Sequence, residues 1–468
     1  MLFNSYEFLF AFLPFVLVLY YLLRRNDGRI VLLTLASYFF YGWWDYRFCF
    51  LMLLTSTVDY LAGRQISRSE QPSTRKRWIA FAVVTNLSVL GFFKYFDLAA
   101  TMANRLAAAL GFPGENGIVP LLHIVLPVGI SFYTFQSMSY SIDVYRRQAR
   151  PAKNFWHYAC FVSLFPQLVA GPIVRYQTVA DQLLERDHTT ARFASGLSLF
   201  ILGLAKKVLL ADAVAPLANH VFGMSDPGLV VSWVGVLAYT MQIYFDFSAY
   251  SDMAVGLGRL IGFEFPQNFN SPYKAESITD FWRRWHMSLS TWLRDYLYIP
   301  LGGNRRGPGR TYINLILTMF LGGLWHGANW TFALWGLYHG SLLALERAFR
   351  GRAFLAWPRI IRVVLTFVLV QVGWVLFRCP TLDQAAAVLA GMAGLNGIGA
   401  SELAFAADWP LALPVLPLTL VIVWFLPNTW EMKPRTGFLY AIGLAVLFCL
   451  CVATMMVNTS SPFLYFQF

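Results

Sequence analysis

Long apolar runs separated by short basic segments dominate the chain. Each run approaches or reaches the roughly 17–25 residues that a membrane-spanning helix needs. The pattern predicts an all-α, multi-pass membrane protein of roughly ten to twelve transmembrane helices. No soluble segment interrupts it, so residues 1–468 are expected to form a single integral-membrane domain. The runs are residues 8–23, 30–44, 78–96, 118–135, 229–245, 331–345, 360–377, 411–426 and 438–457.

The basic residues between the runs predict the orientation in the membrane. Clusters lie at Arg24–Arg29, Arg64–Arg77 and Arg146–Lys153, and Lys433 and Arg435 precede the last run. Lys and Arg are enriched in cytoplasmic loops. The clusters therefore predict an even number of spans with both termini in the periplasm, and the loop at residues 97–117 on the outer side.

Two segments do not read as simple spans. Residues 161–176 are apolar but contain two prolines and a glycine, which favours a re-entrant segment. Lys206 and Lys207 lie inside an apolar helix pattern, which predicts an interfacial helix whose lysines extend towards the membrane surface.

Composition supports a membrane protein and excludes some functions. The chain is 57% hydrophobic and 13% charged, with a net charge of +12. The enrichment of Lys and Arg in cytoplasmic loops explains this positive charge, so no nucleic-acid partner is expected. The five cysteines lie in apolar surroundings without a CxxC pair, which favours core residues over a metal site. No metal is expected.

Polar groups inside apolar runs are the candidates for chemistry. His326 lies in "LGGLWHGANW", and on one helix it would share a face with Asn329 and Trp330. His339 follows thirteen residues later, about 20 Å along a straight helix, so the two histidines would not act on one atom. His326 is either a catalytic group or a core histidine, and His339 is more typical of the core.

A second histidine, His286, lies in residues 278–307, where aromatic residues recur at helical spacing. This pattern predicts one amphipathic helix near the cytoplasmic interface. The helix is either an interface anchor or the wall of a site in which arginines meet an anionic ligand.

Asp246 and Asp252 are the other costly groups. We expect them to pair with arginines of the amphipathic helix. The alternative is a proton-coupled role, which a secondary transporter or flippase would need.

Several long motifs resemble the membrane-bound O-acyltransferase family, in its bacterial alginate O-acetyltransferase-like branch. They are "DFWRRWHMSLSTWLRDYLYIPLGGNR", "LGGLWHGANWTFALWGLYHG", "PVGISFYTFQSMSYSIDVYR", "FPQLVAGPIVRY", "YFDFSAYSDMAVGLG" and the tail "SPFLYFQF". The resemblance runs along the whole chain.

The resemblance implies an acetyltransferase with a central tunnel in the bacterial inner membrane. It places the family's active-site histidine at His326 and a second implicated histidine at His286. The donor would be acetyl-coenzyme A, with no permanently bound cofactor. The partners would be a periplasmic protein of the SGNH-hydrolase type and the polysaccharide synthase machinery.

The polymer is open between alginate, acetylated cellulose and peptidoglycan, with the first two favoured. A D-alanyl transferase for cell-envelope polymers is the nearest alternative.

Physical chemistry adds three expectations to this resemblance. A neutral imidazole at His326 can take the proton of an attacking hydroxyl. Four arginines are candidates for binding the donor's phosphates: Arg283, Arg284, Arg305 and Arg306. The apolar tail must pack somewhere, and its Tyr465 is a candidate acyl acceptor, because a phenyl ester keeps much of its transfer potential. The alternative for the tail is packing alone.

Overall fold

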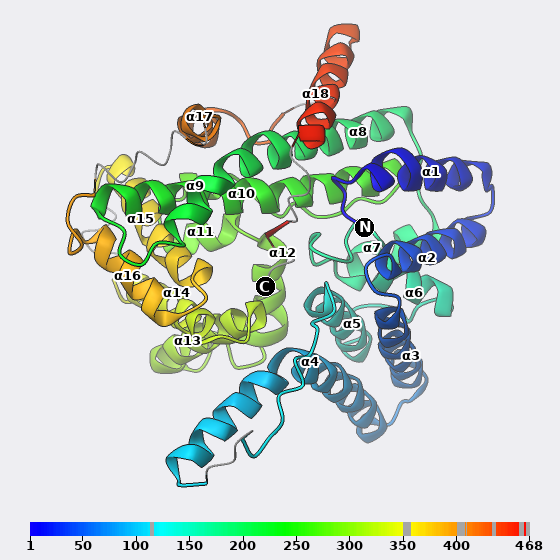
Figure 1. Cartoon of the computed structure of the whole chain (residues 1–468). Helices are drawn as coiled ribbons and strands as arrows, with labels where there is room; N and C mark the ends of the chain where they lie inside the picture. Colours follow the sequence, from blue (N-terminus) through cyan, green and yellow to red (C-terminus); the bar gives the residue numbers. More distant parts are fainter. Residues whose placement is uncertain are drawn as a thin grey trace. The chain divides into compact units, whose positions relative to one another are not determined.

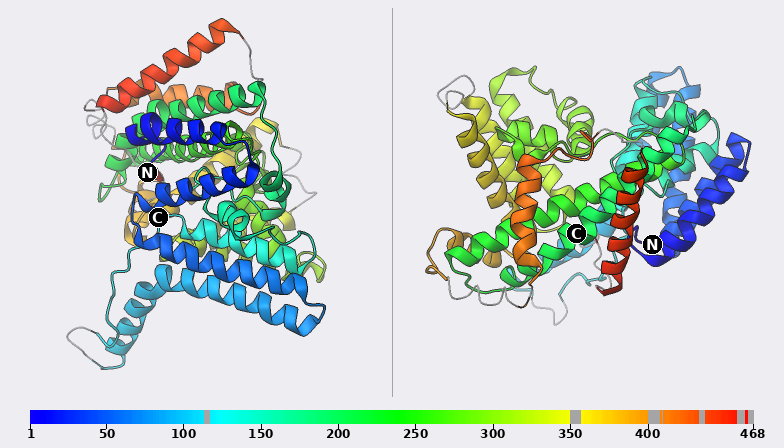
Figure 2. Two further views of the ribbon diagram at one scale, coloured as in Figure 1. Left: turned by 90° about the vertical axis from the view of Figure 1, so that its right-hand side faces the viewer. Right: turned by 90° about the horizontal axis from the view of Figure 1, so that it is seen from above.

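The computed structural model describes residues 1–112, 117–349, 357–399, 408, 410–432, 437–457 and 463–464. These residues are mostly helical, which confirms the predicted all-α class. The chain divides into two compact units, one of residues 1–193 with 258–265 and one of residues 194–257 with 266–468. The single domain expected from sequence stays a prediction, and each unit is described below by itself (Figures 1 and 2).

The first unit contains mostly long helices. They are η1 (Glu7–Phe12), α1 (Leu13–Leu22), α2 (Asn26–Gly42), α3 (Arg47–Arg68), α4 (Pro72–Ala109), α5 (Ile130–Tyr145), α6 (Phe155–Ser163) and α7 (Tyr176–Leu184). Helices α3, α4 and α5 pack against one another. Asp59 of α3 joins them, because its carboxylate accepts hydrogen bonds from Asn86 of α4 at 2.7 Å and Ser141 of α5 at 2.9 Å.

The second unit carries the conspicuous histidines. It contains most of α8 (Thr190–Ala205), η2 (Lys206–Ala211), α9 (Asp212–Val221), most of α10 (Leu229–Leu260), η3 (Pro272–Lys274), α11 (Ile278–Arg284), α12 (Met287–Leu293), η4 (Arg294–Tyr298), α13 (Gly307–His326), α14 (Trp330–Ala348), α15 (Arg359–Arg378), α16 (Leu382–Met392), α17 (Ala412–Phe425) and α18 (Phe438–Val457).

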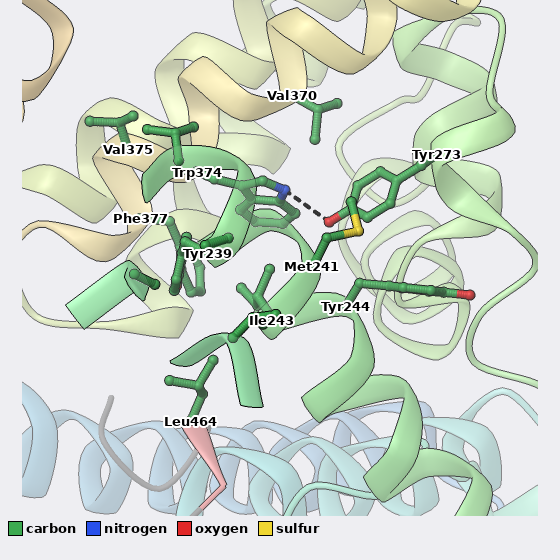
Figure 3. Close-up of a cluster of buried hydrophobic side chains, with 14 of the residues drawn as sticks. Tyr239, Met241, Ile243, Tyr244, Tyr273, Val370, Trp374, Val375, Phe377 and Leu464 are labelled. Carbon is green, nitrogen blue, oxygen red and sulfur yellow. Dashed lines mark hydrogen bonds between the residues drawn. The ribbon is translucent and has the colours of Figure 1, made fainter. Parts of the chain in front are cut away.

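A buried aromatic cluster lies at the centre of the second unit (Figure 3). Trp374 of α15 donates a hydrogen bond from its indole nitrogen to the hydroxyl of Tyr273 at 3.2 Å. Tyr273 in turn donates to the backbone oxygen of Thr240 on α10 at 2.9 Å. The aromatic rings supply buried area, and their polar atoms find partners inside the unit.

Four helices among the described residues are long and apolar enough to cross a membrane, namely α4, α10, α15 and α18. Three shorter apolar segments follow the same pattern, at residues 7–22, 382–392 and 412–425. The apolar helices agree with a multi-pass protein, whereas the expected total of ten to twelve spans stays a prediction.

Two predicted boundaries are wrong. Helix α4 continues to Ala109, so the expected outer loop at residues 97–117 is helical over most of its length. The predicted run at 118–135 becomes helical only at Ile130, after Gly129, which has a left-handed φ of 76°. The prolines at 120 and 127 remove backbone donors from this segment, which explains its irregular start.

The proline- and glycine-rich segment at residues 161–176 is irregular, as predicted. Helix α6 ends at Ser163, and the next helix begins at Tyr176. Phe165, Leu168 and Ala170 are fully buried. Irregular backbone at membrane depth requires such burial.

Glycines allow α13 and α14 to pack closely. A Cβ atom on Gly336 of α14 would lie 2.5 Å from the backbone oxygen of Met319 on α13. A Cβ atom on Gly340 would lie 2.8 Å from Cα of Ile316. Small residues permit this backbone approach between membrane helices, which explains the unusual glycine content of residues 320–340.

We expect Gly336→Ala to destabilise the protein by about 1–3 kcal/mol, because the added methyl group meets backbone that cannot rotate away. Thermal unfolding in detergent measures this effect. Gly309→Ala is the matched control, since Gly309 lies on α13 with nothing within 4 Å of its Cβ position. Equal melting temperatures for the two variants would contradict the close-packing explanation.

Candidate active site

His326 is the last residue of α13, where the chain turns into α14. Gly327 is extended, and Asn329 caps α14 by accepting a hydrogen bond from the Thr331 backbone nitrogen at 3.2 Å. The Asn329 side chain also donates to the Pro380 backbone oxygen at 2.7 Å. The prediction that His326 and Asn329 share a helical face is therefore wrong, and the contacts of Asn329 stabilise the helix start.

Aromatic rings surround the His326 imidazole, which is 7% exposed. The ring centroids of Trp325, Phe377 and Trp335 lie 4.9, 5.1 and 5.3 Å from the imidazole centroid. The imidazole is thus enclosed by rings, and in its neutral form such a group can accept a proton.

His326 and Trp335 both line two cavities in the second unit. One cavity, of about 230 Å³, extends along α13 to Arg294 and Tyr298 of η4. The other, of about 20 Å³, is lined also by Asp246 and Leu464. A group bound in either cavity would contact the same imidazole, which is the arrangement that a transfer reaction requires.

His286 lies at a break between α11 and α12. Its φ of 43° is left-handed, so the single amphipathic helix predicted over residues 278–307 is wrong. A buried, non-glycine residue in this conformation is strained and often belongs to a functional site. The Nδ1 atom of His286 lies 3.2 Å from Oδ1 of Asn268, which also accepts hydrogen bonds from Ser288.

One tryptophan links the two implicated histidines. The Trp325 ring centroid lies 4.9 Å from that of His326 and 6.3 Å from that of His286. The His286 ring also packs edge-on against Phe247, which lines the smaller cavity, at 4.8 Å. The structure thus brings together two residues that lie forty positions apart in the sequence.

His339 lies deeper in the protein. It is fully buried, and its ring centroid is 5.0 Å from Trp335 and 5.2 Å from Trp282. It lines neither cavity that contains His326. These contacts agree with the core role expected from its sequence.

The four candidate phosphate-binding arginines are spread over different surfaces. Arg283 lines a separate cavity of about 730 Å³ between α11, α14 and α15. Arg284 pairs with Asp280 at 2.9 Å on the same helix. Arg305 and Arg306 are exposed just before α13. None of the four lines the cavities of His326, where the basic residue is Arg294.

Asp246 and Asp252 pair with lysines, so the predicted arginine partners are wrong. Lys206 lies 2.8 Å from Asp252, and Lys207 lies 2.6 Å from Asp246 and 2.8 Å from Asp212. The Lys207 side chain is 1% exposed. Lys207 therefore does not extend to a membrane surface, because buried carboxylates hold its ammonium group inside the protein.

The described part of the tail reaches the smaller cavity. Leu464 lines it together with His326, and its backbone nitrogen donates to Asp246 at 2.9 Å. Figure 3 shows the Leu464 side chain pointing towards Ile243 of α10. Phe463 and Leu464 are both buried, which agrees with the expectation that the apolar tail packs. Tyr465 lies outside the described residues.

Sequence reasoning missed the residues that hold the site together. Asn268 orients His286, while Trp335 and Phe377 enclose His326. An asparagine among aromatic residues in "FPQNFNSPY" was the available signal for Asn268. The aromatic residues gave no signal, because any buried ring fits the same pattern.

The chain is similar to one family model and to several known proteins. The model of the membrane-bound O-acyltransferase family matches residues 145–379. The probable alginate O-acetylase AlgI of Azotobacter vinelandii is 44% identical over the whole of both chains. That of Pseudomonas aeruginosa is 49% identical over 82% of this chain and 73% of its own. A peptidoglycan O-acetyltransferase of Helicobacter pylori is 38% identical over 86% and 82% of the two chains.

Proposed function

The chain belongs to the membrane-bound O-acyltransferase family, and on this premise we propose that it takes acetyl from cytoplasmic acetyl-coenzyme A for O-acetylation of a polysaccharide outside the inner membrane. The observation that carries the proposal is His326, a buried histidine on two cavities. The larger cavity would hold the thioester end of the donor. The smaller cavity, of about 20 Å³, would admit the hydroxyl group of the acceptor.

The chemistry needs one base and no redox step. The His326 imidazole takes the proton of an acceptor hydroxyl, whose oxygen attacks the thioester carbonyl carbon. The tetrahedral intermediate collapses with cleavage of the carbon–sulfur bond. The imidazolium returns the proton to the leaving sulfur, which gives an ester and free coenzyme A. The cavities also limit hydrolysis, because apolar walls exclude water.

Arg294 is a better candidate for the donor's phosphates than the four arginines expected from sequence. It lies on the larger cavity with His326, although Asp295 pairs with it at 2.6 Å. Arg283 remains a candidate only if the donor extends into the cavity beside α11.

Alginate is the polymer we propose. The supporting observation is the likeness to probable alginate O-acetylases along the full chain, compared with the lower identity to a peptidoglycan O-acetyltransferase. Acetylated cellulose and D-alanylated envelope polymers are the remaining alternatives. The inner-membrane location, periplasmic termini, SGNH-type partner and synthase machinery belong to the same proposal.

Ester analysis of cell-envelope polymers in a strain lacking the chain tests this function. Alginate, cellulose and peptidoglycan are hydrolysed separately, and released acetate and D-alanine are measured. We expect acetate to disappear from alginate alone and to return when the chain is restored. Unchanged acetate in all three fractions would overturn the acetyltransferase proposal, and loss of D-alanine would favour the alternative.

His286→Ala should lower acetylation by less than His326→Ala, about tenfold, because it removes a neighbouring ring and one donor to Asn268 without removing the base. The measurement is acetyl-coenzyme A consumption with polymer acetylation. His286→Asn is the matched variant, since asparagine tolerates the left-handed backbone. If both readouts stay normal in both variants, His286 has only a structural role.

A further inference from the structure

Lys207, Asp246 and Asp212 form a buried charge cluster on three neighbouring elements, η2, α10 and the start of α9. The ammonium group of Lys207 lies 2.6 Å from Asp246 and 2.8 Å from Asp212. Lys207 and Asp246 are 1% and 2% exposed. Such clusters are expensive to bury, so a role beyond stability is worth testing.

The cluster contacts the carboxy-terminal segment directly. Asp246 uses one carboxylate oxygen for Lys207 and the other for the backbone N–H of Leu464, at 2.9 Å. The Lys207 ammonium group also lies 4.8 Å from the ring centroid of Phe463. That ring packs edge-on against Tyr250 of α10 at 4.9 Å. Two consecutive tail residues are thus held by groups from the helical core.

The site of attachment is the reaction cavity itself. Asp246, Leu464 and His326 line the same cavity. A hydrogen bond between a carboxylate and a backbone N–H is about twice as strong as one between neutral groups. This hydrogen bond involves only the backbone N–H of Leu464. It therefore positions the backbone of the tail without engaging any tail side chain.

We propose that Asp246, held by Lys207, which also pairs with Asp212, is a positioning residue that keeps the carboxy-terminal segment in the His326 cavity during acyl transfer. The proposal rests on the proposed acyl-transfer function, and it does not require that a particular tail residue accept the acyl group. Asp246 itself takes no proton and forms no bond in the reaction.

The neighbouring pair, Lys206 and Asp252, offers a matched control. It lies on the same two elements, η2 and α10, at 2.8 Å. Asp252 accepts hydrogen bonds from Thr429 and Trp430 instead of the tail, at 2.7 and 3.2 Å. It does not line the cavity of His326. Asp252→Asn therefore neutralises an equivalent buried carboxylate without touching the tail.

The first experiment measures whether the tail stays bound. The five native cysteines are replaced by serine or alanine, Leu464 is changed to cysteine, and labelling by a maleimide is timed on the full chain in detergent. Leu464 is 6% exposed, so labelling should be slow. Adding Asp246→Asn should accelerate it about tenfold or more. Asp252→Asn should not. Equal rates with and without Asp246→Asn, or equal acceleration by Asp252→Asn, would overturn the proposal.

Asp246→Asn is a fair variant because Lys207 keeps Asp212 as its partner, so no buried charge loses all compensation. Leu464→Pro is a second, independent variant, since proline removes the donor N–H and leaves the charge cluster intact. Leu464→Ala keeps the N–H and should retain at least about tenfold more transfer than Leu464→Pro. Equal transfer by these two variants would contradict the proposal.

Kinetics separate positioning from a general structural role. Asp246→Asn should lower kcat for acetyl transfer about tenfold and leave KM for acetyl-coenzyme A unchanged, because the donor occupies the other cavity. A raised KM for acetyl-coenzyme A with a normal kcat in Asp246→Asn would overturn the positioning proposal. If the unmodified chain transfers no acetyl group, the proposed function fails, whereas the labelling rates still decide whether Asp246 holds the tail.

Discussion

Cells carrying His326→Ala are expected to lose nearly all polymer acetylation, about 10²–10⁴-fold, while the chain still inserts in the membrane. The attacking hydroxyl needs a base, and His326 is the histidine that lines both cavities of the proposed reaction. Acetate released from the purified polymer gives the measurement. Immunoblotting of membranes confirms that the variant is present at the normal level.

The control is the same substitution at a histidine outside the site. His220 is exposed near the end of α9 and lines neither cavity of His326. His220→Ala should acetylate normally. Normal acetylation in His326→Ala, with expression confirmed, would remove the catalytic assignment.

Tyr465→Phe is expected to have a comparable effect if the tail accepts the acetyl group. The substitution keeps the ring and removes only the phenolic oxygen. Tyr465 follows Leu464, which lines the cavity of His326, and this placement supports the hypothesis. A phenolate, whose ordinary pKa is about 10, leaves more readily than an alkoxide, so an acetylated tyrosine could pass its acetyl group to a partner.

Two readouts test the tyrosine hypothesis. Polymer acetylation should fall to the level of His326→Ala, and mass spectrometry should find acetyl on the tail of the unmodified chain when the periplasmic partner is absent. Phe466→Leu is the control, because it changes a neighbouring ring and keeps the Tyr465 hydroxyl. Polymer acetylation should stay normal in this variant. A fully active Tyr465→Phe chain would leave the tail with a packing role only.

Periodicity predicted the class of the fold well, because apolar runs of helix length leave few alternatives. Periodicity did not predict where individual helices begin, end or break. The turn at His286 interrupts a run of aromatic residues at helical spacing. The segment "WRRWHMSL" contains no glycine or proline that would predict this turn. The strain is compensated by Asn268, a contact from eighteen residues away that a local pattern does not contain.

The candidate histidines were found because imidazoles are rare and costly in apolar runs. Their neighbours were harder to predict. Lys206 and Lys207 read as surface residues, since an unpaired lysine in a membrane helix normally extends to water. Asp212 is a local partner of Lys207, but Asp252 and Asp246 lie 46 and 39 positions from Lys206 and Lys207. Only the packing of η2 against α10 shows these two pairings.

The most direct test of acyl transfer by His326 uses inside-out membrane vesicles supplied with acetyl-coenzyme A labelled in its acetyl group. Vesicles with the unmodified chain should release free coenzyme A thiol, with a burst of about one thiol per chain if the tail is acetylated. Vesicles with His326→Ala should release thiol only at the background rate. Equal thiol release from both, or label entering the vesicles as intact thioester, would contradict acyl transfer by His326.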